Sequence, residues 1–350
     1  SSRFGLPIVV ATSFPRFPSF LVHALSSMAK KRGCWYHVKR TVMKVARLTT
    51  VPVPLWDLYI SYRCGRFPIE QPRMVDYAVE ALSRDKQAAE TCAAGKSGGS
   101  SASSGGGLLR RVPLGELPPK PPNTTRFVIV SDTHERHREV ALPEGDVFLH
   151  CGDILMSSSL TSQSRGLRVL RDFNDWLGSV PCQERLVIGG NHDWALEKLS
   201  EDEQKELLSN AILLHNRSKE VAGTKLKVYG NPHSRGHSHN QAWQGEPQVA
   251  AAQAAEADIV MSHFATGEVK EAVLETPAFT CRPLLWASGH AHEYHGAFEQ
   301  DGTLFVNAAI ANSRYEPIQP PIVVDIMNTE VRADRHDKQP LTLEASACTL

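Results

Sequence analysis

Five short polar motifs, spread in order over residues 132–292, constrain the fold of this 350-residue chain more than any other feature. The motifs are Asp132-Thr-His134, Gly152-Asp153, Gly190-Asn191-His192-Asp193, His263 and Gly289-His290-Ala-His292. Most of them directly follow a run of apolar, β-forming residues, which is where a buried strand is expected to end. The pattern therefore predicts a sheet whose strand ends bring these polar side chains to one site.

The side chains in these motifs are of the kinds that bind metal ions. Together they offer about eight oxygen and nitrogen ligands, which is too many for one tetrahedral zinc and suits two adjacent ions. Each motif alone is weak, because Gly-Asp is a common turn and a single histidine after a strand is usually structural. The ordered set predicts a binuclear metallohydrolase, with phosphate esters as its substrate class.

The segment from residue 125 onward alternates short apolar runs with stretches of helical periodicity, which indicates an α/β fold. We expect strands at 126–130, 146–150, 185–188, 211–214, 225–229, 258–261, 284–287, 303–306 and 322–326. Helices are expected at 167–177, 194–199, 202–209 and 247–255. In such folds ligands bind at the carboxyl ends of the strands, where the motifs lie.

A change of composition over residues 94–124 marks the clearest boundary. The stretch 94–107 is rich in Gly and Ser, and five prolines follow between Pro113 and Pro122. This composition is typical of a linker, flexible first and then stiffened. We therefore expect an N-terminal extension over 1–93 with a helix at 74–89, a linker over 94–124, a catalytic domain over 125–335 and a tail over 336–350.

The overall composition is that of a globular protein, with one asymmetry. Lys plus Arg equals Asp plus Glu, at 38 each, so net charge indicates no particular partner. Seven cysteines without a CxxC pair argue against a disulfide framework, and no apolar run is long enough to span a bilayer. Residues 1–50 hold nine basic and no acidic residues, which is typical of a transit peptide or a disordered basic tail. The expected location is cytoplasmic, or organellar if that stretch is a targeting signal.

The ordered motifs resemble the calcineurin-like metallophosphoesterase superfamily, whose pattern is D-x-H, G-D, G-N-H-D/E, H and G-H-x-H, over residues 126–333. Several stretches are similar to its metallophosphoesterase-domain-containing subfamily. These are Ser131-Asp-Thr-His134, Leu149-His-Cys-Gly-Asp153, Phe173-Asn-Asp-Trp-Leu-Gly178, Val187-Ile-Gly-Gly-Asn-His-Asp193, Val228-Tyr-Gly-Asn-Pro232, Val306-Asn-Ala308, Tyr315-Glu-Pro317 and Pro321-Ile-Val-Val-Asp325. The resemblance implies a sandwich of two mixed β-sheets flanked by helices.

The resemblance also implies two metal sites that share one ligand. One ion would be held by Asp132, His134, Asp153 and His292, and the other by Asp153, Asn191, His263 and His290. Asp153 would bridge the two ions. These ligand types suit divalent Mn, Fe or Zn, and residue chemistry alone does not choose among them.

Two further residues are expected to act in catalysis. The resemblance implies that His192 contacts a phosphoryl oxygen or protonates the leaving group. Asp193 would either orient that imidazole or cap the following helix. The expected reaction is hydrolysis of a small-molecule phosphate ester or nucleotide by a hydroxide shared between two metal ions. Phosphodiesters are favoured by the subfamily resemblance alone.

Several alternatives stay open. The chain could be a metal-binding scaffold or pseudoenzyme that recruits partners through its N-terminal extension, whereas nucleic-acid binding is disfavoured because aromatic residues are sparse there. Arg136, His137 and Arg138 either contact the substrate phosphate or form a solvated basic loop. The chain departs from many relatives at Phe264-Ala-Thr-Gly267, where they have Gly-Pro-Pro. It also departs at 231–240, where His233, His237 and His239 either approach the substrate or lie in a surface loop.

Overall fold

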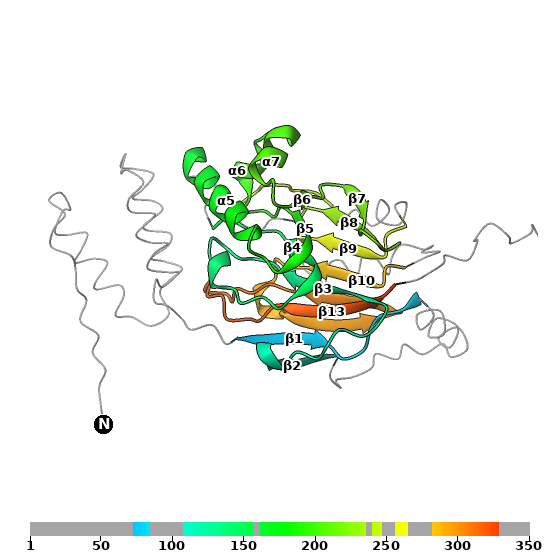
Figure 1. The fold of residues 1–350 in the computed structure, drawn as a ribbon. Helices are drawn as coiled ribbons and strands as arrows, with labels where there is room; N and C mark the ends of the chain where they lie inside the picture. The colour runs from blue at the N-terminus through cyan, green and yellow to red at the C-terminus, as the bar shows by residue number, and fades with distance from the viewer. Residues whose placement is uncertain are drawn as a thin grey trace, which may run out of the picture. The chain divides into compact units, whose positions relative to one another are not determined.

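The central strands carry apolar side chains on both faces, so a layer of structure is required on each side of the sheet. The computed structural model describes residues 73–84, 108–156, 162–235, 240–246, 256–264 and 282–328, all of which belong to one compact unit. Two mixed sheets face each other in it, as the α/β sandwich predicts (Figure 1). The helix expected at 247–255, the stretch 94–107 and the tail 336–350 lie outside the described residues.

The first sheet has seven strands in the order β2-β1-β13-β3-β4-β5-β6. They are β1 (Met74–Ala78), β2 (Leu109–Pro113), β3 (Thr124–Val130), β4 (Gly145–Cys151), β5 (Cys182–Ile188), β6 (Ile212–Leu213) and β13 (Ile322–Met327). Strands β3 to β6 run parallel, and β13 pairs antiparallel with β3. The carboxyl ends of β3, β4 and β5 therefore share one edge of the sheet.

The second sheet has six strands in the order β11-β12-β10-β9-β8-β7. They are β7 (Arg217–Glu220), β8 (Lys227–Asn231), β9 (Ile259–Ser262), β10 (Leu285–Ser288), β11 (Gly296–Gln300) and β12 (Thr303–Asn307). Its four inner strands run parallel, and β7 and β11 pair antiparallel at the two edges.

Short helices complete the described chain. They are α5 (Gln163–Leu177), α6 (Trp194–Glu197), α7 (Glu201–Leu207) and the 3-10 turns η1 (Leu114–Glu116), η2 (His137–Glu139) and η3 (His292–Tyr294). The apolar residues of α5 recur on one face, and the helix ends at Gly178, as the sequence predicts. In α7 the side chains of Ser200 and Glu203 form a capping box, which fixes its first turn.

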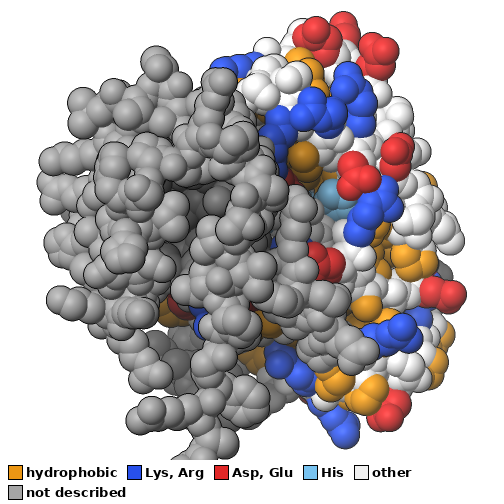
Figure 2. Space-filling view, turned by 90° about the vertical axis from the view of Figure 1, so that its left-hand side faces the viewer, with side chains coloured by type: hydrophobic (Ala, Val, Ile, Leu, Met, Phe, Trp, Pro, Cys, Tyr) orange, Lys and Arg blue, Asp and Glu red, His pale blue; other side chains and the backbone are white. Residues whose placement is uncertain are grey.

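Acidic and basic side chains alternate over the described part of the surface that Figure 2 shows. On that face neither sign of charge gathers into a broad patch, in keeping with equal numbers of acidic and basic residues in the chain. In the part of the chain that the structure describes, no helix has the length and apolar character needed to cross a membrane.

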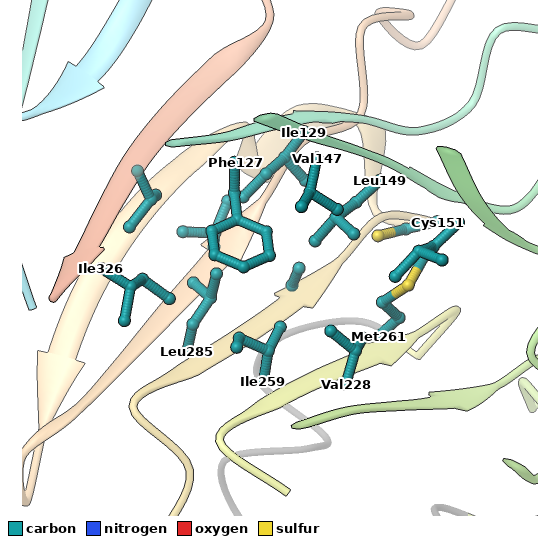
Figure 3. Close-up of a cluster of buried hydrophobic side chains, with 14 of the residues drawn as sticks. Phe127, Ile129, Val147, Leu149, Cys151, Val228, Ile259, Met261, Leu285 and Ile326 are labelled. Carbon is teal, nitrogen blue, oxygen red and sulfur yellow. The ribbon is translucent and has the colours of Figure 1, made fainter. Parts of the chain in front are cut away.

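The alternation of side chains along β3 divides the core into two halves. Phe127 and Ile129 are fully buried and point toward the second sheet, where they meet residues such as Ile259 and Leu285 (Figure 3). The intervening valines of β3 lie on the opposite face and pack into a cluster that includes Phe173 of α5. The sheet is thus covered by the second sheet on one side and by helices on the other.

Strands β1 and β2 come from residues that the sequence analysis put outside the catalytic domain. The helix predicted over 74–89 is wrong at its start, because residues 74–78 form β1 along the edge of β13. Val75 is fully buried there, and Arg84 reaches the second sheet by an ion pair with Asp258 (2.6 Å). Pairing with distant strands overrides the local helical pattern at this position.

The buried carboxylate of Asp76 links β1 to β2 and to His295. Arg111 of β2 donates two hydrogen bonds to Asp76 of β1 (2.7 and 2.8 Å), and His295 lies 3.2 Å from the same carboxylate. Burial alone would raise the pKa of Asp76, but Arg111 and His295 outweigh it and hold the pKa at about 2. The hairpin is therefore fastened to the turn that follows η3.

Removing residues 1–121 should destabilise the remaining chain, because the deletion takes away β1 and β2 and exposes the backbone edge of β13. We expect residues 122–350 to melt about 5 °C or more below residues 62–350, and to associate more readily. Thermal denaturation followed by circular dichroism, together with light scattering, measures both properties. Equal melting temperatures in two monodisperse samples would contradict the structural role of the hairpin.

Replacing Asp76 with Asn should lower the free energy of unfolding by about 2 kcal/mol at neutral pH, since the native pKa of about 2 lies below the ordinary 3.8. A depressed carboxyl pKa contributes stability above pH 4, and this contribution is lost as the pH falls toward 2. The difference in unfolding free energy between the two proteins, measured by urea unfolding, should therefore shrink from pH 7 through pH 3.5 to pH 2.5. Asp202→Asn is the control, because that side chain is 96% exposed. A difference in unfolding free energy that does not change with pH would show that the pKa of Asp76 is not depressed in the folded protein.

Candidate metal centre

The polar motifs meet where the carboxyl ends of strands from both sheets come together. The first two motifs follow β3 and β4, the third connects β5 to α6, and the last two follow β9 and β10. All nine residues that the sequence analysis selected lie in these connections: Asp132, His134, Asp153, Asn191, His192, Asp193, His263, His290 and His292. The sandwich thus assembles one site from segments far apart in the sequence.

A first group of ligand atoms lies around Asp132. Its Oδ1 atom is 3.1 Å from Nε2 of His292, which is 3.1 Å from Nε2 of His134. The Nδ1 atom of His134 donates to the carbonyl oxygen of Leu155 (3.1 Å), and Nδ1 of His292 donates to that of Asn312 (3.0 Å). Each ring in its neutral form therefore turns an Nε2 lone pair toward the other ring and the carboxylate. Acceptors that converge in this way repel one another unless a cation or a proton lies among them.

A second group lies around Asn191. Its Oδ1 atom is 3.1 Å from Nε2 of His263 and 3.1 Å from Nδ1 of His290. The amide nitrogen of Asn191 donates to the carbonyl of Asn240 (3.3 Å), which leaves the oxygen directed at the two rings. The Nδ1 atom of His263 donates to the carbonyl of Cys151 (2.7 Å), so in the neutral form of this ring the Nε2 lone pair also faces inward. This group likewise consists of acceptors.

Asp153 lies between the two groups. Its Oδ1 atom is 3.3 Å from Nε2 of His263, whereas Oδ2 is 3.8 Å from Nε2 of both His134 and His192. A carboxylate turned to both sides in this way could contact a cation in each group. Within the described chain, the His and Asp atoms that could hold a metal form three groups, two of which contain Asp153. Oxygen and imidazole donors of this kind fit Mn, Fe or Zn.

His192 lies beside this bridge. Its Nε2 atom accepts a hydrogen bond from the side-chain amide of Asn240 (3.0 Å), and its Nδ1 atom faces the carbonyl of Met156 (3.4 Å). One of the three candidate metal groups combines His192 with His134 and Asp153. The ring is thus within reach of a cation held by those residues and of a ligand bound next to it.

Asp193 occupies the N-cap position of α6, as one of the two sequence expectations has it, although its side chain makes no capping hydrogen bond. Its carboxylate accepts from the backbone amides of Ile154 (3.2 Å), Leu155 (2.8 Å) and Gly190 (2.9 Å), and not from the His192 ring or from a cap position of α6. Burial and the nearby Asp153 charge raise the pKa of Asp193 to about 7. Asp193 therefore joins the connection after β4 to the connection after β5.

The backbone is strained at several of the candidate ligands. Asp132, His134, Asp153 and His290 all adopt left-handed conformations, with φ of 57°, 44°, 57° and 68°. Such conformations cost on the order of 1–3 kcal/mol each and persist only where the surroundings impose them. Gly190 permits the close packing that imposes them, because a Cβ at this position would overlap the Asp153 carboxylate.

The charges of the site favour cations. Burial lowers the pKa of His134 to about 3 and of His290 to about 4, so both rings are neutral at pH 7 and can donate lone pairs. Burial also opposes a proton on His263, but the Asp153 carboxylate outweighs it and raises the pKa of His263 to about 10. A cation bound at this position must therefore displace a proton.

The basic loop after the first motif is occupied by ion pairs. Arg136 donates to Glu139 (2.8 and 2.6 Å), whereas His137 and Arg138 both contact Asp172. The carboxylate partners argue against direct contact with a substrate phosphate, but Arg136 and His137 are buried, so only Arg138 fits the solvated-loop alternative. Of the histidine-rich stretch, His233 bonds to Asn231, and His237 and His239 lie outside the described residues.

Two residues at the site were not selected from the sequence as functional. Asn240 bonds to His192 and Asn191 from the end of the histidine-rich stretch. Tyr315 places its ring against His134 and His292. No sequence motif marks Asn240 as functional. Tyr315 was noted only because the stretch Tyr315-Glu-Pro317 is similar to the subfamily.

Comparison with known proteins agrees with this geometry. The family model of the calcineurin-like phosphoesterase superfamily domain matches residues 126–324. The human protein "Metallophosphoesterase domain-containing protein 1" is 30% identical over 253 residues, which cover 59% of this chain and 73% of that protein; its mouse counterpart gives the same values. "UPF0046 protein C25E10.12" of Caenorhabditis elegans is 29% identical over 58% of this chain and 82% of its own length.

The match covers more than half of the chain and includes every motif described above. The fold of two mixed sheets and the His and Asp clusters are those expected of metal-dependent phosphoester hydrolases. The chain therefore belongs to the calcineurin-like phosphoesterase superfamily and, within it, to the metallophosphoesterase-domain-containing subfamily.

Proposed function

We propose that this protein hydrolyses phosphodiesters with two divalent metal ions bound at the junction of the two sheets. The observation that supports it most is the convergence of seven acceptor side chains on two adjacent groups, with Asp153 turned toward both. Carbonyl oxygens fix the rings of His134, His263 and His292 from behind. Such outer contacts are typical of metal-binding histidines.

When bound, two divalent cations supply an activated water as nucleophile and neutralise charge on the phosphoryl group. The chain itself supplies orientation and a proton donor. Burial lowers the pKa of His192, so its ring is neutral before substrate binds, and the negative charge of a phosphate raises that pKa again. An ester oxygen next to Nε2 would take the place of the Asn240 amide and accept a hydrogen bond from the protonated ring.

The charges around the site favour a diester over a monoester. A phosphomonoester is a dianion near neutral pH and is usually bound with additional cationic side chains. The arginines of the loop after the first motif are paired with Glu139 and Asp172. A diester carries a single negative charge, so it places a smaller demand on side chains beyond the metal ligands.

The proposal predicts metal-dependent hydrolysis of bis-p-nitrophenyl phosphate in preference to p-nitrophenyl phosphate. Protein stripped of metal should be inactive and should regain activity with added Mn. Asp153→Asn should lower the rate by more than the roughly 100-fold seen for outer contacts, because it weakens both sites. Asp202→Asn on the exposed face of α7 is the matched control.

Two outcomes would count against this reading. A folded protein that binds two metal ions but hydrolyses neither ester would favour the scaffold alternative. Faster hydrolysis of the monoester would reverse the substrate preference while keeping the metal chemistry.

Replacing His192 with Ala should reduce kcat by roughly 100- to 10,000-fold, the range of general acid catalysis. Metal content, measured by elemental analysis, should stay at two ions per chain, since the proposed ligand sets do not include this ring. Unchanged turnover would remove His192 from the mechanism. Loss of one ion would instead reassign His192 as a ligand with His134 and Asp153.

A further inference from the structure

Tyr315 lies against three histidines of the centre. Its ring centroid is 4.8 Å from that of His134, 5.2 Å from that of His292 and 6.2 Å from that of His192. The ring planes are close to perpendicular for the first two pairs, at 89° and 87°. Tyr315 therefore forms a wall beside the first ligand group and the proposed proton donor.

The backbone of Tyr315 is held in an unfavourable conformation. Its φ of 62° is left-handed, which is rare for a bulky side chain. The amide of Tyr315 donates to the carbonyl of Asn312 (2.8 Å), and Oδ1 of Asn312 accepts from the amides of Arg314 and Glu316 (2.9 and 3.0 Å). These hydrogen bonds hold the backbone of Tyr315 in its left-handed conformation and so fix the position of its ring.

The same loop also supports the metal centre, because the carbonyl of Asn312 accepts a hydrogen bond from His292. Tyr315 is only partly buried, whereas His134, which it contacts, is buried. Tyr315 therefore keeps some exposed surface beside the centre. A planar organic group attached to the phosphorus could pack on it, and aromatic pairs of this kind favour stacked or edge-on contacts.

We propose that Tyr315 contacts the organic group of the substrate and selects phosphate esters that carry an aromatic or heteroaromatic group. This inference rests on the proposed function, since it places the phosphate at the metal ions. Stacking on one aromatic side chain should strengthen binding of an aromatic ligand by about tenfold relative to an alkyl ligand.

Binding of two non-hydrolysable probes tests the inference. Methylphenylphosphinate and dimethylphosphinate, which carry one negative charge as a diester does, are titrated calorimetrically into the full-length, Mn-loaded protein. It should bind the phenyl compound about tenfold more tightly. Tyr315→Asn removes the ring yet suits a left-handed backbone, so it should fold and bring the ratio of the two Kd values close to one. Tyr315→Phe should keep the ratio. Tyr294→Leu is the control, because that tyrosine is 74% exposed.

The outcomes separate this inference from the proposed function. An unchanged ratio in Tyr315→Asn, or equal weakening of both probes, would show that Tyr315 only supports the loop and would overturn the inference. Absence of metal-dependent binding of either probe to the unaltered protein would overturn the proposed function, and this inference with it. A Kd ratio close to one in Tyr315→Asn, with dimethylphosphinate binding retained, would establish the contact.

Discussion

The organisation of this protein depends on one buried carboxylate, that of Asp153. Burying a carboxylate is costly unless charges or hydrogen bonds compensate, and here they come from three separate connections. The amide of His192 donates to Oδ1 (2.9 Å), His263 lies beside the same oxygen, and His134 lies beside the other. These residues follow β5, β9 and β3, whereas Asp153 itself follows β4. Both sheets must therefore be in place before this carboxylate is compensated, which ties the fold and the site together.

Much of the α/β core could be predicted because its signals are local. The strands predicted from the apolar runs that end at Val130 and His150 agree with β3 and β4 to within two residues. Buried parallel strands are apolar along their whole length, so such runs are easy to recognise. The strand–motif order also predicted where the polar residues would meet, because carboxyl ends of parallel strands share an edge. The structure brings these residues together as expected. Their individual roles as ligands or catalysts remain proposals.

What the sequence did not reveal depends on long-range contacts. Strand β1 forms along β13, more than 200 residues away, and no local pattern encodes that pairing. Edge strands β7 and β11 are short or poorly buried, so they lack a strong alternation. The carboxylate of Asp193 bonds to amides in a different connection, and Asn240 reaches His192 from a segment 48 residues away. The left-handed backbone of Tyr315 is imposed by its loop and is invisible in composition.

His295 connects the candidate metal centre to the strands that precede the family segment. His295 directly follows η3, which begins with the proposed ligand His292, and it bonds to Asp76 on β1 and to the carbonyl of Ala309. The β1–β2 hairpin lies before the segment matched by the family model, yet it holds the turn that presents His290 and His292. Strands β1 and β2 thus belong to the same folded unit as the described residues from 125 onward, although they precede the predicted catalytic segment. We infer that the added strands support one wall of the candidate metal centre from the sheet edge, through the contact between Asp76 and His295.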